Sequence, residues 1–340
     1  MRAVKTTLGI VGLCFVAALA FVSSSLQGRG TRPAVGALRQ AFSGDLEIAW
    51  YDGGGDGSGR PCVVLLASFA RPVSDFNELA QSLHREGFRT LAVESRGIGG
   101  SHGGGFLASP TLADLAADVE AVLSASELAA DTSVHVVGHA FGNRVARTFA
   151  THYAERARSV TLIAAGGRAP IPEELTRAIL VSSLTFLPWS RREPELRRAF
   201  FAADSEIPDH WATGWWLWGG LAQDQANRAS HGEDFWAAGG APMLVFQGDQ
   251  DVISPPALAG EALLADFPER VRLISVVGAG HALLPEQPEQ IASALISFLR
   301  ELEAQRGVTA AGRSSTTTLF SSVSPPRSIE STISRPIPDR

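Results

Sequence analysis

The chain has 340 residues, 45% of them hydrophobic and 19% charged, so it is long enough to bury a large hydrophobic core. This length fits one large α/β domain with an insertion, or two ordinary domains. The formal net charge is −6 and no basic run is present, which argues against nucleic acid as a partner. We therefore expect a small-molecule substrate or ligand. The only lysine is Lys5, so the chain after it has no lysine for Schiff-base chemistry.

Residues 1–22 have the pattern of a signal peptide or an N-terminal anchor. Arg2 and Lys5 precede an apolar run over residues 8–22, and Ala18-Leu19-Ala20 has the small-x-small form of a cleavage site. The run is shorter than the roughly 20 apolar residues that a spanning helix needs. The pattern favours export to the periplasm or the extracellular space, with membrane anchoring by the N-terminus as the alternative. We expect contact with a membrane only through residues 1–22, if they are not cleaved.

A linker is expected over residues 23–39, and strands alternating with helices over residues 40–167. Short apolar or alternating runs predict strands at 45–51, 62–67, 90–93, 134–137 and 159–165. Helical patterns follow at 77–85, after the N-cap residue Thr111, and directly after the strand at 134–137. This alternation predicts a parallel sheet with right-handed crossovers.

The alternation stops at residue 168 and resumes at residue 241. Residues 168–240 contain helical stretches, several prolines and six of the seven tryptophans, which predicts a helical cap. Residues 241–303 form the second part of the core, with strands at 242–247 and 270–277 and a closing helix at 288–303. Residues 304–340 are rich in Ser, Thr, Pro and Gly and poor in large apolar groups, so we expect a disordered tail.

The stretch from Val134 to Ala150 combines a β-branched strand, a glycine-flanked turn and a helix. This is the order of a nucleophile elbow, G-x-S-x-G, in which small residues let the turn close while its central side chain stands exposed. Gly138 and Gly142 are in place. The central residue is Ala140, whose methyl group cannot attack a substrate. The elbow therefore lacks its nucleophile.

Two more motifs each follow a predicted strand. The pattern G-x-x-D-x-x-x-P at residues 248–255 places an acid at Asp251, and Gly278-Ala279-Gly280-His281 ends in a histidine. A carboxylate bonded to one imidazole nitrogen fixes the tautomer and leaves the other nitrogen free to take a proton. Asp249 is the nearest competitor for the acid role, and we expect it to bond the turn backbone instead.

With elbow, acid and histidine in this order, residues 40–303 resemble the α/β-hydrolase superfamily. The resemblance implies a doubly wound, mostly parallel sheet with a helical cap insertion, and a triad whose nucleophile position is Ala140. It also implies an oxyanion hole formed by the backbone N–H groups of Phe69 and Phe141. The chain departs from the family pattern twice. Ala67-Ser68-Phe69 stands where His-Gly is usual, and Glu94-Ser95-Arg96-Gly97 stands where D-x-R-G is usual.

Four residues are candidates for lining the pocket, namely Ser68, His139, Trp215 and Trp218. Ser68 and Ser95 are also candidates for a replacement nucleophile, although local bonding to the backbone is the common role of such serines. For the cap tryptophans, packing into the core is the alternative to lining a pocket for an apolar ligand. No residue pattern calls for a metal or a cofactor, and we expect neither.

Three hypotheses about function remain open. The first is a hydrolase for a small apolar ester or a related carbonyl compound, in which His281, oriented by Asp251, activates water directly. The second is a non-catalytic protein that binds a ligand or a partner on a hydrolase scaffold. The third is an inactivated variant of a serine enzyme. Substrate identity is not encoded in any motif, because specificity in this fold lies in the cap.

Overall fold

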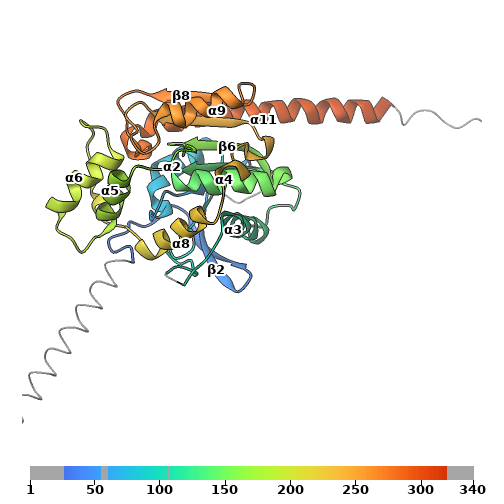
Figure 1. The fold of residues 1–340 in the computed structure, drawn as a ribbon. Coiled ribbons are helices and arrows are strands. Elements are labelled where there is room, and N and C mark those ends of the chain that lie inside the picture. Colours follow the sequence, from blue (N-terminus) through green and yellow to red (C-terminus); the bar gives the residue numbers. More distant parts are fainter. Residues whose placement is uncertain (1–26, 55–59, 106, 320–340) are drawn as a thin grey trace, which may run out of the picture. The chain divides into compact units, whose positions relative to one another are not determined.

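The computed structural model describes residues 27–54, 60–105 and 107–319, with side chains as far as residue 306 (Figure 1). The chain divides into two compact units, Met1–Phe298 and Leu299–Arg340. The predicted signal peptide or anchor at residues 1–22 lies outside the described residues. Among the described residues, no helix is both long and apolar enough to cross a membrane.

A mostly parallel sheet forms the core of the first unit and confirms the predicted fold class. Its strand order is β1-β2-β4-β3-β5-β6-β7-β8, with the pairs β1–β2 and β2–β4 antiparallel and all others parallel. The central strands are buried along their whole length, as expected for strands covered on both faces. The strands are β1 (Ala37–Ser43), β2 (Leu46–Gly53), β3 (Cys62–Leu66), β4 (Arg89–Val93), β5 (Val134–His139), β6 (Ala157–Ile163), β7 (Met243–Gly248) and β8 (Val271–Val276).

Helices follow the strands as crossovers. Thr111 caps α3 as predicted, because its hydroxyl accepts from the Asp114 N–H at 3.1 Å and the Asp114 carboxylate accepts from the Thr111 N–H at 2.7 Å. The helices outside the cap are α2 (Asn77–Arg85), α3 (Leu112–Ala125), α4 (Phe141–His152), α9 (Gly260–Asp266), α10 (Leu283–Glu286) and α11 (Pro288–Leu319). Short 3-10 turns occur at η1 (Val73–Phe76), η2 (Ala154–Arg156), η3 (Gly232–Asp234), η4 (Ala238–Gly240) and η5 (Pro256–Leu258).

Residues 168–240 connect β6 to β7 and carry α5 (Glu173–Ser183), α6 (Trp189–Phe200), α7 (Asp209–Ala212) and α8 (Leu217–Arg228). Helices α5 and α6 pack on each other, and Figure 1 shows them as a pair at one end of the sheet. Trp211 and Trp215 are fully buried and meet edge to face, with ring centres 5.9 Å apart. These aromatic rings belong to a hydrophobic cluster that also contains Ala70, Ile253 and Ala282 from outside the cap.

The described part of the predicted linker at residues 23–39 makes contacts and overlaps the first strand. Residues 27–35 are fixed to the cap and to α2: Gly28 donates to the Trp215 carbonyl at 2.9 Å, and Asn77 donates to the Pro33 carbonyl at 2.9 Å. The chain then enters β1 at Ala37, an edge strand whose exposed Leu38 and Phe42 break the usual alternation. Sequence periodicity misses such contacts because they join segments far apart in the chain.

The second unit contains the end of α11, which continues to Leu319. The predicted disordered tail begins at residue 304, whereas α11 continues through residues 304–319; residues 320–340 lie outside the described residues. Extending a formed helix adds one hydrogen bond per residue without a new nucleation cost, so a segment without an apolar face can continue it.

Candidate active site

The elbow has the geometry that its glycines predict. Ala140 adopts φ +49° and ψ −107°, between the end of β5 and the start of α4. A Cβ at Gly142 would lie 2.1 Å from the Leu66 carbonyl oxygen, and one at Gly138 would lie 2.4 Å from the Gly142 backbone. Neither glycine can carry a side chain in this turn. Ala140 itself holds a positive φ that costs about 1–3 kcal/mol for a residue with a Cβ.

Asp251 and His281 meet at the carboxyl edge of the sheet. The Nδ1 atom of His281 lies 2.8 Å from the Oδ2 atom of Asp251, and both residues are buried. The same carboxylate accepts from the Gln247 side chain at 3.0 Å and from the Ser254 N–H at 2.8 Å, which fixes its orientation. Asp249 is exposed and accepts instead from the Gly278 N–H at 2.8 Å.

The second ring nitrogen of His281, Nε2, makes no hydrogen bond within the described part of the chain. Because the carboxylate accepts at Nδ1, the proton of the neutral ring lies there and Nε2 carries the lone pair. The ring of His139 lies behind it, 6.1 Å away between centres, and His139 Nε2 donates to the His281 carbonyl at 3.0 Å. Burial and the nearby His281 lower the pKa of His139 to about 4, so His139 is neutral at ordinary pH. It supports the His281 backbone.

The two amides predicted for the oxyanion hole have no internal acceptor. Neither the Phe69 N–H nor the Phe141 N–H donates to any group among the described residues. The neighbouring Ala70 N–H, in contrast, donates to the Gln223 side chain of α8 at 2.7 Å, and the Ala70 carbonyl accepts from Trp216 at 2.9 Å. The cap therefore holds this loop on both sides of Ala70 and leaves the Phe69 amide free.

A buried arginine, paired with an aspartate of the same loop, fixes this loop to the cap. Arg71 donates two hydrogen bonds of 2.8 Å to Asp75, and its guanidinium lies 4.7 and 4.8 Å from the ring centres of Trp211 and Trp215. Arg71 also donates to the Thr213 carbonyl at 2.8 Å. Burial tends to raise the pKa of Asp75, but the charge and hydrogen bonds of Arg71 outweigh it and hold that pKa below its usual value.

The four predicted pocket-lining residues lie in different surroundings. Trp215 is buried between Arg71 and Phe200 and packs as core. Trp218 is half-buried on the cap helix α8. His139 is buried and donates to the carbonyl of His281. Ser68 is buried at the start of the oxyanion loop, and its hydroxyl has no hydrogen-bond partner among the described residues.

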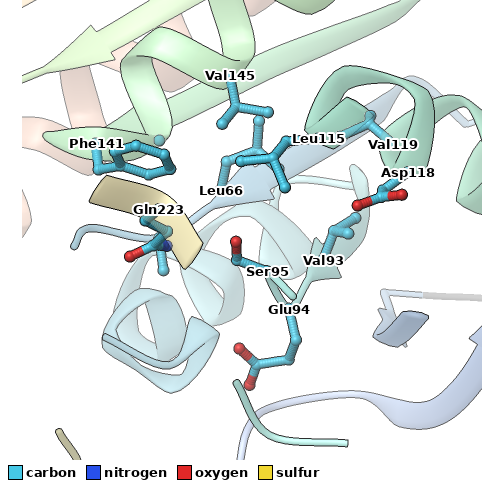
Figure 2. A pocket seen from close by; sticks show the side chains of 12 residues that line it. Leu66, Val93, Glu94, Ser95, Leu115, Asp118, Val119, Phe141, Val145 and Gln223 are labelled. Atoms are coloured by element: carbon cyan, nitrogen blue, oxygen red, sulfur yellow. The ribbon is translucent and has the colours of Figure 1, made fainter. Parts of the chain in front are cut away.

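Ser95 points into a small cavity beside the elbow (Figure 2). The cavity has a volume of about 20 Å³, room for about one water molecule, and its walls are mostly apolar. Phe141 and Gly142 of the elbow form one wall and Gln223 of the cap another. His281 does not line it, so this cavity does not bring Ser95 and the histidine together.

Glu94 replaces the aspartate of the usual D-x-R-G turn and is buried. Its carboxylate accepts from the Val73 N–H at 3.2 Å, and burial raises the pKa of Glu94 to about 8. Figure 2 shows the carboxylate directed away from the labelled apolar side chains. No group of three or more potential metal ligands occurs among the described residues.

Sequence comparison supplies the family. A family profile described as serine aminopeptidase, S33, matches residues 57–288. The chain belongs to this family of α/β-hydrolases. A comparison with curated protein sequences gives no match.

Solved structures share the fold of this S33 chain at low sequence identity. A membrane phospholipase A, a bacterial virulence factor, matches with a TM-score of 0.62 and 20% identity, over 89% of this chain and 99% of its own. An esterase from Thermogutta terrifontis matches with a TM-score of 0.64 and 22% identity, over 78% of this chain and 99% of its own. A carboxylesterase from Bacillus subtilis matches with a TM-score of 0.63 and 17% identity, over 85% of this chain and 98% of its own. At these identities the likeness concerns the fold alone.

Three residues that shape the site of this S33 chain escaped sequence analysis. Arg71 and Asp75 stand four residues apart, and this spacing was the one available signal for their pairing. Gln223 carried no signal, because its partner Ala70 is 153 residues away in the chain.

Proposed function

We propose that the protein is a hydrolase for a small apolar ester or a related carbonyl compound, and that it works without a covalent intermediate. The observation that carries the proposal is His281, hydrogen-bonded to Asp251 at Nδ1 and without a hydrogen bond at Nε2 among the described residues. The unengaged amides of Phe69 and Phe141 support it, because they are the donors that a developing oxyanion needs.

In the proposed reaction, water takes the place of the missing nucleophile. His281 Nε2 accepts a proton from water as the water oxygen bonds to the carbonyl carbon, and Asp251 stabilises the resulting imidazolium. The amides of Phe69 and Phe141 bind the oxyanion. The tetrahedral intermediate then expels the alcohol, which takes the proton back from His281, and a carboxylic acid remains. The methyl group of Ala140 takes no part in bond formation.

The rate expected for such a site restricts its substrates. Removing the serine of a complete triad lowers turnover about a million-fold, and the remaining groups still give about a thousand- to ten-thousand-fold over water. A site of this kind turns over substrates with good leaving groups or strained carbonyls. Activated esters are therefore the first compounds to test.

The alternative is a non-catalytic binding protein, and the closure of the site favours it. Ala140 is 7% exposed and His281 only 4%, while Trp211 and Trp215 of the cap are fully buried above the oxyanion loop. In this alternative the S33 scaffold binds an apolar ligand or a partner, and His281 has no catalytic role.

Comparing His281→Ala with wild type on 4-nitrophenyl acetate and butyrate separates the two functions. A general base contributes about a hundred- to ten-thousand-fold, so the variant is expected to lose at least a hundredfold in kcat/KM. His102→Ala is the matched control, because its exposed imidazole reports background reaction of surface histidines with nitrophenyl esters. Equal rates in all three proteins would refute the hydrolase. Strong labelling of wild type by a fluorophosphonate would refute both functions.

We also propose that residues 1–22 export the protein or anchor it to a membrane. The charged start, the apolar run and the small-x-small site support this proposal. Fractionation of expressing cells, followed by sequencing of the mature N-terminus, tests it. Recovery of the uncleaved chain in the soluble cytoplasmic fraction would contradict it.

A further inference from the structure

Three arginines gather around two aromatic rings beyond the elbow. Arg144 and Arg147 lie on α4, and their guanidinium carbons are 5.9 and 5.1 Å from the ring centre of Phe235. Arg147 also lies 5.0 Å from the ring centre of Trp236, and Arg168 lies 4.3 Å from the same ring. The guanidinium groups of Arg144 and Arg147 therefore both lie against the ring of Phe235.

Arg147 is fully buried and incompletely bonded. Its Nε donates to the Asn143 carbonyl at 3.3 Å and its Nη2 donates to the Gly166 carbonyl at 3.1 Å. Its Nη1 has no hydrogen-bond partner among the described residues, and both acceptors that it does have are neutral. The guanidinium of Arg144 donates to no acceptor in the described part of the chain. Donors of a buried cation thus remain unused.

The two carboxylates near this cluster form ion pairs with Arg168, and with neither Arg144 nor Arg147 among the described residues. Glu233 and Asp266 bind Arg168 at 2.7 and 2.8 Å, and Asp266 also accepts from the Trp236 indole. No carboxylate forms an ion pair with Arg144 or Arg147 among the described residues. Burial, and then repulsion from Arg144 and Arg168, lower the pKa of Arg147 to about 9, which still leaves it protonated at neutral pH.

The positive charge of the buried Arg147, next to that of the half-buried Arg144, has no counter-charge among the described residues. This is unfavourable, because burial removes the solvation of a cation and only a partner restores it. We propose that Arg144 and Arg147 bind a small oxyanion, a carboxylate or a phosphate group. Planar guanidinium donors match the oxygens of both groups. The site is separate from the proposed hydrolytic site, and it stands whether or not the protein hydrolyses esters.

The anion reaches the arginine cluster from solvent at the loop after β6. Gly166 and Gly167 are half-buried and Arg168 is exposed, so the cluster borders solvent there. A Cβ at Gly166 would lie 3.7–3.9 Å from the guanidinium of Arg144, in ordinary contact with it. The absence of a side chain at Gly166 therefore leaves that guanidinium accessible.

Thermal unfolding of the full chain in phosphate, and separately in acetate, tests the site against sodium chloride at equal ionic strength. A ligand that binds only the folded state raises Tm, and the stabilisation grows as the logarithm of 1 + [L]/Kd. We expect phosphate or acetate to raise the Tm of wild type by several degrees beyond the chloride control. The anion with the larger shift at equal concentration identifies the preferred group.

Two variants assign the effect to the cluster. Arg144→Gln removes one charge and should weaken the apparent affinity for the anion at least tenfold, and Gly166→Ala should weaken it by covering the guanidinium without removing any charge. Arg228→Gln is the control, because that arginine is exposed and pairs with Asp224. Equal shifts in Arg144→Gln and wild type would overturn the proposal. So would the absence of any shift beyond chloride in wild type.

Discussion

The backbone N–H of Ala140 donates to the carbonyl oxygen of Ile163 at 2.9 Å, which ties the tip of the elbow to the end of the neighbouring strand β6. The bond holds Ala140 in its positive φ, a conformation that alanine rarely adopts. The turn is thus kept in the shape that presents a central side chain, although that side chain is a methyl group.

Ala140→Ser is expected to create a serine hydrolase. The hydroxyl would occupy the elbow position of a triad whose acid and histidine are already paired, so kcat/KM on 4-nitrophenyl butyrate should rise at least a thousandfold. A fluorophosphonate should label the variant and not the wild type. Ala140→Gly is the control, since it fits the same φ and adds no nucleophile. A folded Ala140→Ser protein with neither gain nor label would show that the site has been rebuilt for another purpose.

Gly142→Ala is expected to destabilise the fold by several kcal/mol. Its Cβ would sit 2.1 Å from the Leu66 carbonyl oxygen, and this backbone contact cannot relax as a flexible side chain would. Urea unfolding measures the change in the free energy of unfolding. Gly232→Ala is the matched substitution, because a Cβ there meets nothing within 4 Å. Similar midpoints for the two variants would contradict the close approach of α4 to β3.

Breaking the Arg71–Asp75 pair is expected to cost about 3–5 kcal/mol, because either single substitution leaves a buried charge without its partner. Arg71→Met and Asp75→Leu should each show this loss in urea unfolding. The double variant should lose less than their sum, because it leaves no unpaired charge. The exposed pair Asp224–Arg228 has the same spacing, and breaking it should cost below about 1 kcal/mol. Strict additivity at Arg71 and Asp75 would refute the coupling.

Glu94 is expected to make the fold less stable as pH rises. Its pKa is about 8 in the folded protein against 4.5 for an unperturbed glutamate, so between these values the folded chain keeps a proton that the unfolded chain releases. The free energy of unfolding should therefore fall across this window, by on the order of 1 kcal/mol per pH unit, and level off above pH 8.

Glu94→Gln isolates this contribution. The amide oxygen can still accept from the Val73 N–H, so the variant keeps the bond and loses only the titration. Urea unfolding at pH 5, 6.5 and 8 should show wild type losing stability relative to the variant as pH rises. Parallel pH profiles for the two proteins would show that the Glu94 carboxyl is not held neutral.

The sequence by itself determined the sheet, the elbow and the partners Asp251 and His281, because each depends on local patterns. Apolar runs of strand length, glycines on both sides of a turn, and an acid or a histidine just after a strand are all visible within a few residues. The parallel sheet brings the carboxyl ends of its strands to one edge, so residues in those turns are expected to meet.

Only the tertiary structure decided what surrounds these residues. Several contacts join segments that no periodicity connects. They are those of residues 27–35 with the cap, the hydrogen bond from Ala70 to Gln223, and the arginine cluster around Phe235. Trp215 could equally have lined a pocket or packed as core, and its burial against Arg71 was settled by the placement of the cap on the oxyanion loop. Such contacts depend on how elements pack in space, and the free energy of that packing depends on residues from several separate segments of the chain.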